Sequence, residues 1–256
     1  MALINGTTDI VIKIFCLYFD GKYSPDYIEK LYNGLKRNCT VPFEFICYSD
    51  TDVVADKVIP LPKDTKIKQH WHKLKFFDKS FTGDGDIIVM DIDQVIISDI
   101  TEMVNWPVKE KELVSYKKWW SYSPDALPLN GGWYKFKAGS LQHVWDKYNS
   151  DPEYWQMYYY KNSIVHHKYF GEQNFVVESC LENDVEITTM PGEWIAKYEK
   201  DRKLNITYNL MYCEVFDQDF MILGEELNEN IKIVHFANFN NNIHDHPDEW
   251  IKDYWC

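Results

Sequence analysis

The chain has 256 residues, of which 45% are hydrophobic and 26% are charged, and its formal net charge is −13. This composition excludes a disordered chain, and the strong negative charge argues against nucleic acid and anionic lipid surfaces as partners. A chain of this length can bury a large core, so we expect one compact domain over residues 1–256 with two lobes.

The six cysteines are scattered without Cys-x-x-Cys spacing, so the sequence predicts no zinc or redox motif, and free thiols are the simpler interpretation. No run approaches the roughly 20 apolar residues of a membrane helix. The first residues, Met1–Gly6, lack the pattern of a signal peptide. We therefore expect a soluble protein of a reducing compartment, the cytoplasm.

Strands and helices are expected to alternate in the first part of the chain. The predicted strands cover residues 10–19, 43–48, 58–61, 86–90 and 94–97, and the predicted helices cover 25–37 and 70–80. Such alternation predicts an α/β protein in which helices cover a mostly parallel sheet.

Two carboxylates follow the apolar strand at residues 86–90. Asp91 and Asp93 are one residue apart, and on an extended segment both side chains would point the same way. Ligands of open α/β sheets bind outside the carboxyl ends of the strands, and a hard cation such as Mg²⁺ or Mn²⁺ prefers carboxylates together with phosphate oxygens and water. The bare Asp-x-Asp is weak evidence, but the buried strand before it favours a metal site.

The second part of the chain is less regular. We expect a strand at residues 113–116, helices at 141–148 and 171–181, a strand at 231–236, and either a helix or a tyrosine-rich loop at 154–162. Asn130, Gly131 and Gly132 either let the backbone approach a ligand or form a plain turn. The last stretch, with His244 and His246, is expected to be a flexible, solvated tail or to supply polar contacts.

Several segments, in order, resemble the GT-A fold glycosyltransferases, in which an Asp-x-Asp after a buried strand binds the metal and the donor diphosphate. The similar segments are residues 10–19, 43–50, 71–77, 91–93, 130–136, 171–175 and 233–236. The pattern is most similar to the glycogenin-like and bacterial galactosyltransferase branch, and small soluble enzymes of this kind occur in bacteria and large DNA viruses. For a viral source, the expected location is the host cytoplasm.

The resemblance implies a function and a set of site residues. It implies transfer of a sugar from a UDP-sugar, by default UDP-glucose, to a hydroxyl of a glycan or protein-linked acceptor. Residues 1–98 would form the nucleotide-binding half, and residues 99–256 the acceptor and sugar half. Mn²⁺ or Mg²⁺ would be held by Asp91, Asp93 and His235, although a lone His in an apolar strand is more often structural.

The other implied residues fall into two groups. Donor binding is expected from Leu17, Tyr18, Ser49, Asp50, Lys73, Asp91, Asp93, Asn130, Gly131 and Gly132. Glu172 and Gln173 are expected at the sugar, and Glu172 or Asp125 could serve as the base of an inverting reaction, whereas a retaining reaction needs none. The branch usually continues after the late His-Phe with Gly and then Lys-Pro-Trp, whereas this chain reads Ala237-Asn238-Phe239.

Three other functions compete with this interpretation. A sugar-nucleotide nucleotidyltransferase should carry a Gly-rich, basic loop after the first strand, where this chain reads Asp20-Gly21-Lys22-Tyr23-Ser24-Pro25. A non-catalytic glycan-binding module would use the abundant aromatics without metal or nucleotide. A phosphatase-like enzyme would need a nucleophilic Asp after the first strand, and the residues after Asp20 do not match that pattern.

Overall fold

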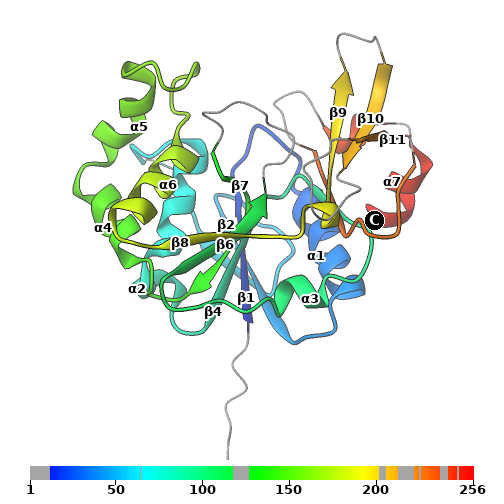
Figure 1. Cartoon of the computed structure of the whole chain (residues 1–256), viewed down its shortest axis with the longest axis horizontal. Coiled ribbons are helices and arrows are strands. Elements are labelled where there is room, and N and C mark those ends of the chain that lie inside the picture. The colour runs from blue at the N-terminus through cyan, green and yellow to red at the C-terminus, as the bar shows by residue number, and fades with distance from the viewer. Residues whose placement is uncertain are drawn as a thin grey trace, which may run out of the picture.

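Two β-sheets, of seven and five strands, organise the computed structural model of the chain (Figure 1). The structure describes residues 12–63, 65–117, 127–201, 206–212, 222–224, 226–236, 242–246 and 248–256. The seven-stranded sheet has the order β3-β2-β1-β4-β7-β6-β8. Its strands are β1 (Ile12–Tyr18), β2 (Phe43–Ser49), β3 (Lys57–Pro60), β4 (Asp86–Met90), β6 (Glu112–Lys117), β7 (Leu129–Lys137) and β8 (Glu186–Met190).

Most neighbours in this sheet are parallel. The pairs β3–β2, β2–β1, β1–β4 and β6–β8 are parallel, whereas β7 runs antiparallel to both β4 and β6. The predicted α/β class with a mostly parallel mixed sheet and helical cover is therefore confirmed.

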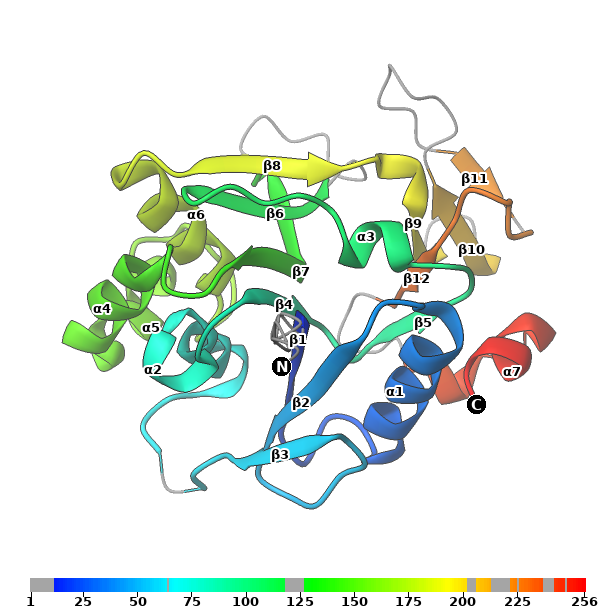
Figure 2. The same ribbon diagram turned by 90° about the horizontal axis from the view of Figure 1, so that it is seen from below.

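The two faces of this sheet contact different cores, because successive side chains of a strand point to opposite sides. In β1, Ile14 and Cys16 pack in the core that contains α1 (Asp26–Asn38), and Phe15 and Leu17 pack in the core of the other face. That second face is covered by η1 (Gln69–Phe77), α2 (Lys79–Thr82), α4 (Gln142–Ser150) and α6 (Glu172–Glu182), which lie together in Figure 2.

The five-stranded sheet lies beside α1 and has the order β11-β10-β9-β12-β5. Its strands are β5 (Gln94–Ile96), β9 (Ile195–Asp201), β10 (Ile206–Tyr212), β11 (Ile222–Gly224) and β12 (Ile233–His235). Strands β4 and β5 follow one another in the chain yet belong to different sheets. The chain therefore crosses from one sheet to the other at Asp91–Asp93.

Most of the predicted elements are confirmed. The strands expected near residues 10–19, 43–48, 58–61, 86–90, 94–97, 113–116 and 231–236 correspond to β1 to β6 and β12, although residues 10 and 11 lie outside the described part. The helices expected at 25–37, 141–148 and 171–181 correspond to α1, α4 and α6. The uncertain segment at 154–162 is a helix, α5 (Pro152–Lys161), whose first turn is capped by the Asp151 carboxylate.

The single helix expected at 70–80 is wrong. The structure has the 3₁₀ helix η1, then an extended residue, Asp78 (φ −79°, ψ 112°), and then the short helix α2. The Asp78 carboxylate accepts a hydrogen bond from the Ser80 backbone N–H at 3.0 Å. Asp78 thus acts as an N-cap, and such a cap requires non-helical backbone, which interrupts the helix.

Asn130, Gly131 and Gly132 do not form a plain turn. They lie inside β7, which pairs with β4 and β6 and is buried along almost its whole length. Two adjacent glycines reduce strand propensity, so the local sequence disfavours this strand. Pairing on both sides stabilises it nonetheless. Strand β8 and the strands β9 to β11 were not predicted either.

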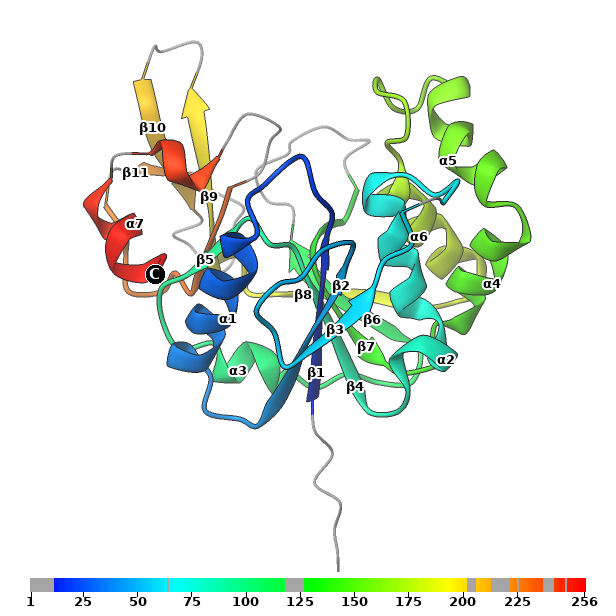
Figure 3. The same ribbon diagram turned by 180° about the vertical axis from the view of Figure 1, so that it is seen from behind.

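The solvated tail expected after His235 is also wrong for the described residues there. Ile243 in η3 (Ile243–Asp245), Ile251 in α7 (Glu249–Tyr254) and Trp255 are buried. The Arg37 guanidinium on α1 donates to the Tyr254 carbonyl at 2.6 Å, and α7 lies next to α1 in Figure 3. The buried apolar side chains spaced along this segment hold it against the rest of the protein.

Two further expectations concern thiols and membranes. Cys16, Cys39, Cys47, Cys180 and Cys256 are free, as predicted, and Cys213 lies outside the described residues. Within the described chain, no helix has both the length and the apolar character needed to cross a membrane. Two short elements complete the fold, α3 (Thr101–Val104) and η2 (Gly192–Trp194).

Trp71 joins η1 to the chain that leads into α6. Its side chain is fully buried and stacks on Tyr148 with 5.6 Å between ring centroids. Its indole Nε1–H donates to the Tyr169 carbonyl at 2.6 Å. Trp71 therefore holds η1 against the loop before α6.

We predict that Trp71→Ala lowers the free energy of unfolding by about 3–5 kcal/mol, because it removes a fully buried aromatic side chain and leaves a cavity. Urea denaturation followed by circular dichroism measures the change. Trp145→Ala is the matched control, since Trp145 is only partly buried. An equal loss in both variants would contradict the bridging role of Trp71.

Candidate functional site

The turn at Asp91–Asp93 is anchored to both sheets by backbone hydrogen bonds. The Asp91 N–H donates to the Gly132 carbonyl of β7 at 3.0 Å, and the Phe236 N–H donates to the Asp93 carbonyl at 2.8 Å. The chain bends at Ile92 and Asp93 as it changes sheets. The expected extended conformation is therefore wrong, and the two carboxylates have different partners.

Asp91 forms an ion pair with Lys73 of η1. The Lys73 side chain is 8% exposed, and its ammonium also donates to the Gly131 carbonyl at 3.2 Å. Burial opposes the charged form of Asp91, but the adjacent Lys73 ammonium outweighs burial and holds the pKa of Asp91 below its ordinary value. The pair is thus a carboxylate and an ammonium, both charged, at the edge of the sheet.

Asp93 lies between a tyrosine and a histidine. Its Oδ2 accepts a hydrogen bond from the Tyr23 hydroxyl at 2.8 Å, and its Oδ1 is 3.9 Å from His235 Nδ1. His235 is 4% exposed, and burial lowers its pKa despite the opposite influence of Asp93 and Asp91. The imidazole is therefore neutral at physiological pH, which is the form that binds metals.

Strand β7 brings backbone groups up to the carboxylates. The pairing of β6 with β7 shifts register between Ser115 and Tyr116, so β7 carries extra residues at Gly131–Trp133, as in a β-bulge. The Gly132 carbonyl accepts from Gln94 Nε2 at 2.7 Å, and its N–H donates to Asn130 Oδ1 at 2.8 Å. A Cβ at Gly132 would lie 2.8 Å from Gln94 Nε2 and 2.9 Å from Asn130 Oδ1. A side chain at this position would therefore force Gln94 or Asn130 to shift.

Glu172 opens α6 and lies close enough to Lys73 to interact with it electrostatically. Its side chain is buried, and its Oε1 has no hydrogen-bond partner within the described chain. Burial raises the pKa of Glu172 to about 7. The Lys73 ammonium lowers this pKa, and the Asp91 carboxylate raises it further. Gln173 is also close, since its Nε2 would lie 3.0 Å from a Cβ at Gly131. Both residues therefore belong to the cluster around Lys73.

The residues expected at the nucleoside lie at the ends of β1 and β2. Leu17, Tyr18 and Ser49 are buried, and the Tyr18 hydroxyl donates to the Tyr23 carbonyl at 2.8 Å. Asp50 accepts from the Asp20 N–H at 3.1 Å. Parallel pairing of β1 with β2 and β4 places these residues along the edge that carries Asp91. Asp125 lies outside the described residues.

The donor set around Asp93 suits a hard divalent cation in its chemistry. Asp93 and the neutral His235 are adjacent, and Asp91 is ionised at the start of the same turn. Among the described residues, however, no group of three His, Cys, Asp or Glu side chains is arranged around a metal position. The carboxylate of Asp91 is paired with Lys73 instead.

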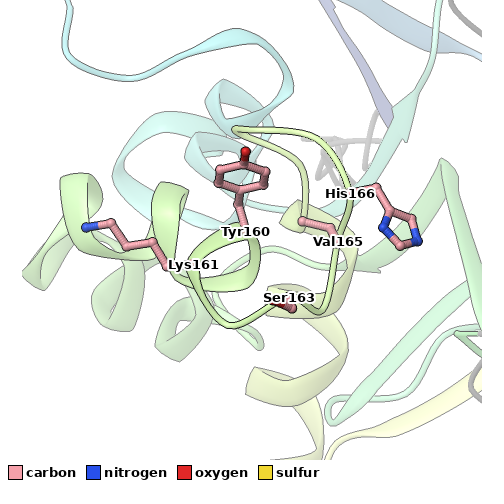
Figure 4. Close-up of a pocket in the computed structure, with 5 residues that line it drawn as sticks. All are labelled: Tyr160, Lys161, Ser163, Val165 and His166. Carbon is pink, nitrogen blue, oxygen red and sulfur yellow. The ribbon is translucent and has the colours of Figure 1, made fainter.

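A separate pocket of about 480 Å³ lies where α5 ends and the loop toward α6 begins. Tyr160, Lys161, Ser163, Val165 and His166 line it (Figure 4). None of the predicted site residues lines this pocket. It lies in the segment that continues, through Tyr169 and Gly171, to Glu172.

Three residues of the site were not predicted. Tyr23 contacts Asp93, Gln94 holds Gly132, and Lys197 of β9 lies beside His235 in the parallel β9–β12 register. Tyr23 could have been found, because it follows the carboxyl end of the first strand, where ligands of such sheets bind. Lys197 could not have been found, since only the pairing of β9 with β12 brings it there.

Comparisons with known proteins relate this fold to glycosyltransferases. No protein-family model and no curated protein sequence matches the chain. The galactosyltransferase LgtC, solved with donor and acceptor sugar analogues, superposes with a TM-score of 0.55 at 9% identity, covering 92% of this chain and 90% of LgtC. The bifunctional glycosyltransferase WbbM has a TM-score of 0.55 at 10% identity, covering 98% of this chain and 52% of WbbM.

A third similar structure is the apo form of the glycosyltransferase GlyE from Streptococcus pneumoniae TIGR4, with a TM-score of 0.52 at 11% identity. That superposition covers 73% of this chain and 46% of GlyE. The chain thus spans about half the length of GlyE and WbbM. These likenesses establish the fold as the GT-A fold of nucleotide-sugar glycosyltransferases, as the sequence predicts.

We predict that Glu172→Gln changes the pH dependence of stability. Because the pKa of Glu172 is raised from 4.5 to about 7, its contribution to folding stability is fully present below pH 4.5 and is lost as the pH rises through 7. The variant should therefore gain stability relative to wild type across this range, by roughly 3 kcal/mol in total. Urea denaturation between pH 4.5 and 8 measures the difference.

Glu182→Gln is the control for this experiment, because Glu182 is an exposed carboxylate on the same helix. The environment described for Glu172 would be contradicted if the difference in free energy of unfolding between wild type and Glu172→Gln stayed the same at all these pH values.

We also predict that Gly132→Ala destabilises the protein by about 1–3 kcal/mol, the typical cost of overpacking, because Gln94 and Asn130 are both held by hydrogen bonds and cannot move away freely. Gly34→Ala in α1 is the control. The three atoms nearest to a Cβ there belong to Ile96 and lie at 3.4 Å or more, and alanine favours helix. Thermal unfolding of both variants tests the difference, and equal melting temperatures would contradict the close approach at Gly132.

Proposed function

We propose that this chain is a glycosyltransferase that moves a sugar from a UDP-sugar, with UDP-glucose as the default donor, to a hydroxyl of a glycan or protein-linked acceptor. One observation carries the proposal. In a GT-A fold, Asp91 and Asp93 lie at the carboxyl end of β4 and are gathered with Lys73, His235, the backbone of Gly131–Gly132 and Glu172.

The proposal includes a divalent ion, Mn²⁺ or Mg²⁺. Asp91, Asp93 and His235 would hold it, and when bound it would neutralise charge that develops on the leaving diphosphate. The ionised Asp91 and the neutral imidazole of His235 support this assignment, since both are in the protonation state that binds metal.

Lys73 is the proposed cation for the donor phosphates. It is buried beside Asp91 and Gly131, and the chain as a whole is strongly acidic. A phosphate group therefore gains attraction from this local ammonium and not from the general field of the protein. Since Asp91 already neutralises Lys73, a donor diphosphate would share the ammonium with it.

The sugar is proposed to contact Glu172, Gln173 and the backbone at Asn130–Gly132. Glycine at positions 131 and 132 lets a ligand approach the main chain closely. The unpartnered Oε1 of Glu172 is buried, and a buried carboxyl group gains free energy when a sugar hydroxyl pairs with it. With a pKa of about 7, Glu172 can either donate to or accept from such a hydroxyl near neutral pH.

We assign the two halves of the chain to the two substrates. Residues 1–98 would bind the nucleoside through Leu17, Tyr18, Ser49 and Asp50 at the ends of β1 and β2. Residues 99–256 would bind the sugar and the acceptor, and the pocket at the end of α5 belongs to this half. Asp125 remains a proposed base for an inverting reaction, as an alternative to Glu172.

Calorimetric titration with UDP-glucose tests the proposal. We expect wild type to bind UDP-glucose more tightly with Mn²⁺ than without it, and Asp93→Ala to lose the gain, because truncation removes a carboxylate that holds the ion. GDP- and dTDP-sugars, titrated next, identify the nucleotide.

Asp84→Ala is the matched control, since Asp84 is a largely exposed carboxylate just before β4, at the end of that strand away from Asp93. It should bind the donor as wild type does. Binding that depends neither on Mn²⁺ nor on Asp93 would overturn the proposed mechanism, and binding of no sugar nucleotide would overturn the proposed function.

A further inference from the structure

Tyr23, in the loop between β1 and α1, contacts Asp93 and is held in place by two further contacts. Its hydroxyl donates to Asp93 Oδ2 at 2.8 Å. Its carbonyl accepts from the Tyr18 hydroxyl at 2.8 Å, which ties the loop backbone to the end of β1. Its ring stacks on Tyr27 of α1 with 4.6 Å between centroids and an interplanar angle of 26°. The hydroxyl of Tyr23 therefore has a defined position relative to the turn that carries Asp93.

Tyr27 continues this contact to the segment beyond β12. It is fully buried, and its hydroxyl donates to Asn242 Oδ1 at 2.6 Å. The hydroxyl oxygen of Tyr27 also accepts a hydrogen bond from the Ile243 N–H at 2.8 Å. The chain from Tyr23 to Tyr27 thus connects Asp93 with the segment that starts at Asn242. Asp93, at one end of these contacts, lies beside His235.

We propose that Tyr23 is a positioning residue for the metal site, which orients the Asp93 carboxylate so that Oδ1 faces His235, and that Tyr27 and Asn242 fix Tyr23 in this role. The inference rests on the proposed function, because it assumes that Asp93 and His235 bind the ion.

The geometry at Asp93 explains how such positioning works. A carboxylate has two oxygens, and the Tyr23 hydroxyl occupies Oδ2, so that Oδ1 is left on the side of His235 Nδ1, 3.9 Å away. Without the hydroxyl the carboxylate can rotate about its terminal torsion, which is broad and allows many orientations. Hydrogen-bond partners that orient metal ligands typically contribute 10–100-fold to metal affinity.

Tyr32, in α1 like Tyr27, offers a matched comparison for Tyr23. Its hydroxyl also donates to an aspartate, Asp56, and its ring also stacks on an aromatic neighbour, Phe45, at 5.1 Å. Asp56, however, holds the Phe45 N–H at 2.8 Å, at the opposite end of β2 from the site. Removing the Tyr32 hydroxyl therefore breaks the same kind of bond without touching the proposed ligands.

The test is Mn²⁺ binding to the whole 256-residue chain, measured by electron paramagnetic resonance of free and bound Mn²⁺ with and without UDP-glucose. Tyr23→Phe keeps the ring stacked on Tyr27 and removes only the hydroxyl. We expect it to weaken Mn²⁺ binding by roughly 10-fold or more. We expect Tyr32→Phe to bind Mn²⁺ as wild type does, and Tyr27→Phe to give a smaller loss than Tyr23→Phe.

Each outcome decides between the inference and the function on which it rests. If wild type binds Mn²⁺ and Tyr23→Phe binds it equally well, the inference is overturned and the proposed function stands. Equal weakening in Tyr23→Phe and Tyr32→Phe would also overturn it, because it would mark a general loss of stability. If wild type binds no Mn²⁺ under either condition, the metal assignment fails and the inference fails with it.

Discussion

The arrangement of this molecule depends on the crossing of the chain from one sheet to the other at Asp91–Asp93. Backbone hydrogen bonds from Asp91 to Gly132 and from Phe236 to Asp93 fasten the turn to β7 on one side and to β12 on the other. Because both strands are buried in well-packed cores, the turn has little freedom. The two carboxylates are held where the two sheets meet, and every other group of the site is placed relative to them.

The crossing also explains why the carboxylates differ in their surroundings. Asp91 still belongs to the edge of the seven-stranded sheet, where η1 brings Lys73 and α6 brings Glu172. Asp93 already belongs to the second sheet, where β12 brings His235 and the loop before α1 brings Tyr23. One turn therefore presents an ion pair on one side and a carboxylate–imidazole pair on the other.

Electrostatic balance within the site is local. The chain carries 40 acidic and 27 basic residues, so its general field repels anionic ligands. Against this field, Lys73 is buried between Asp91 and Gly131, and Lys197 lies beside His235. Burial raises the strength of such local interactions, because the effective dielectric is lower than in water. Among the described residues, these cations offset the general field at the site.

The sequence by itself determined the regular parts of this protein. The apolar runs of β1, β2 and β4 and the periodicity of α1 set the α/β class, and the carboxylates after β4 marked the edge that carries the site, because both signals are local. Only the tertiary structure decided that β5 leaves the first sheet, that Gly131 and Gly132 lie in a strand, and that Tyr23, Gln94 and Lys197 join the site. These outcomes depend on pairing between segments that are distant in the sequence. Such pairing can override the intrinsic conformational preference of a residue.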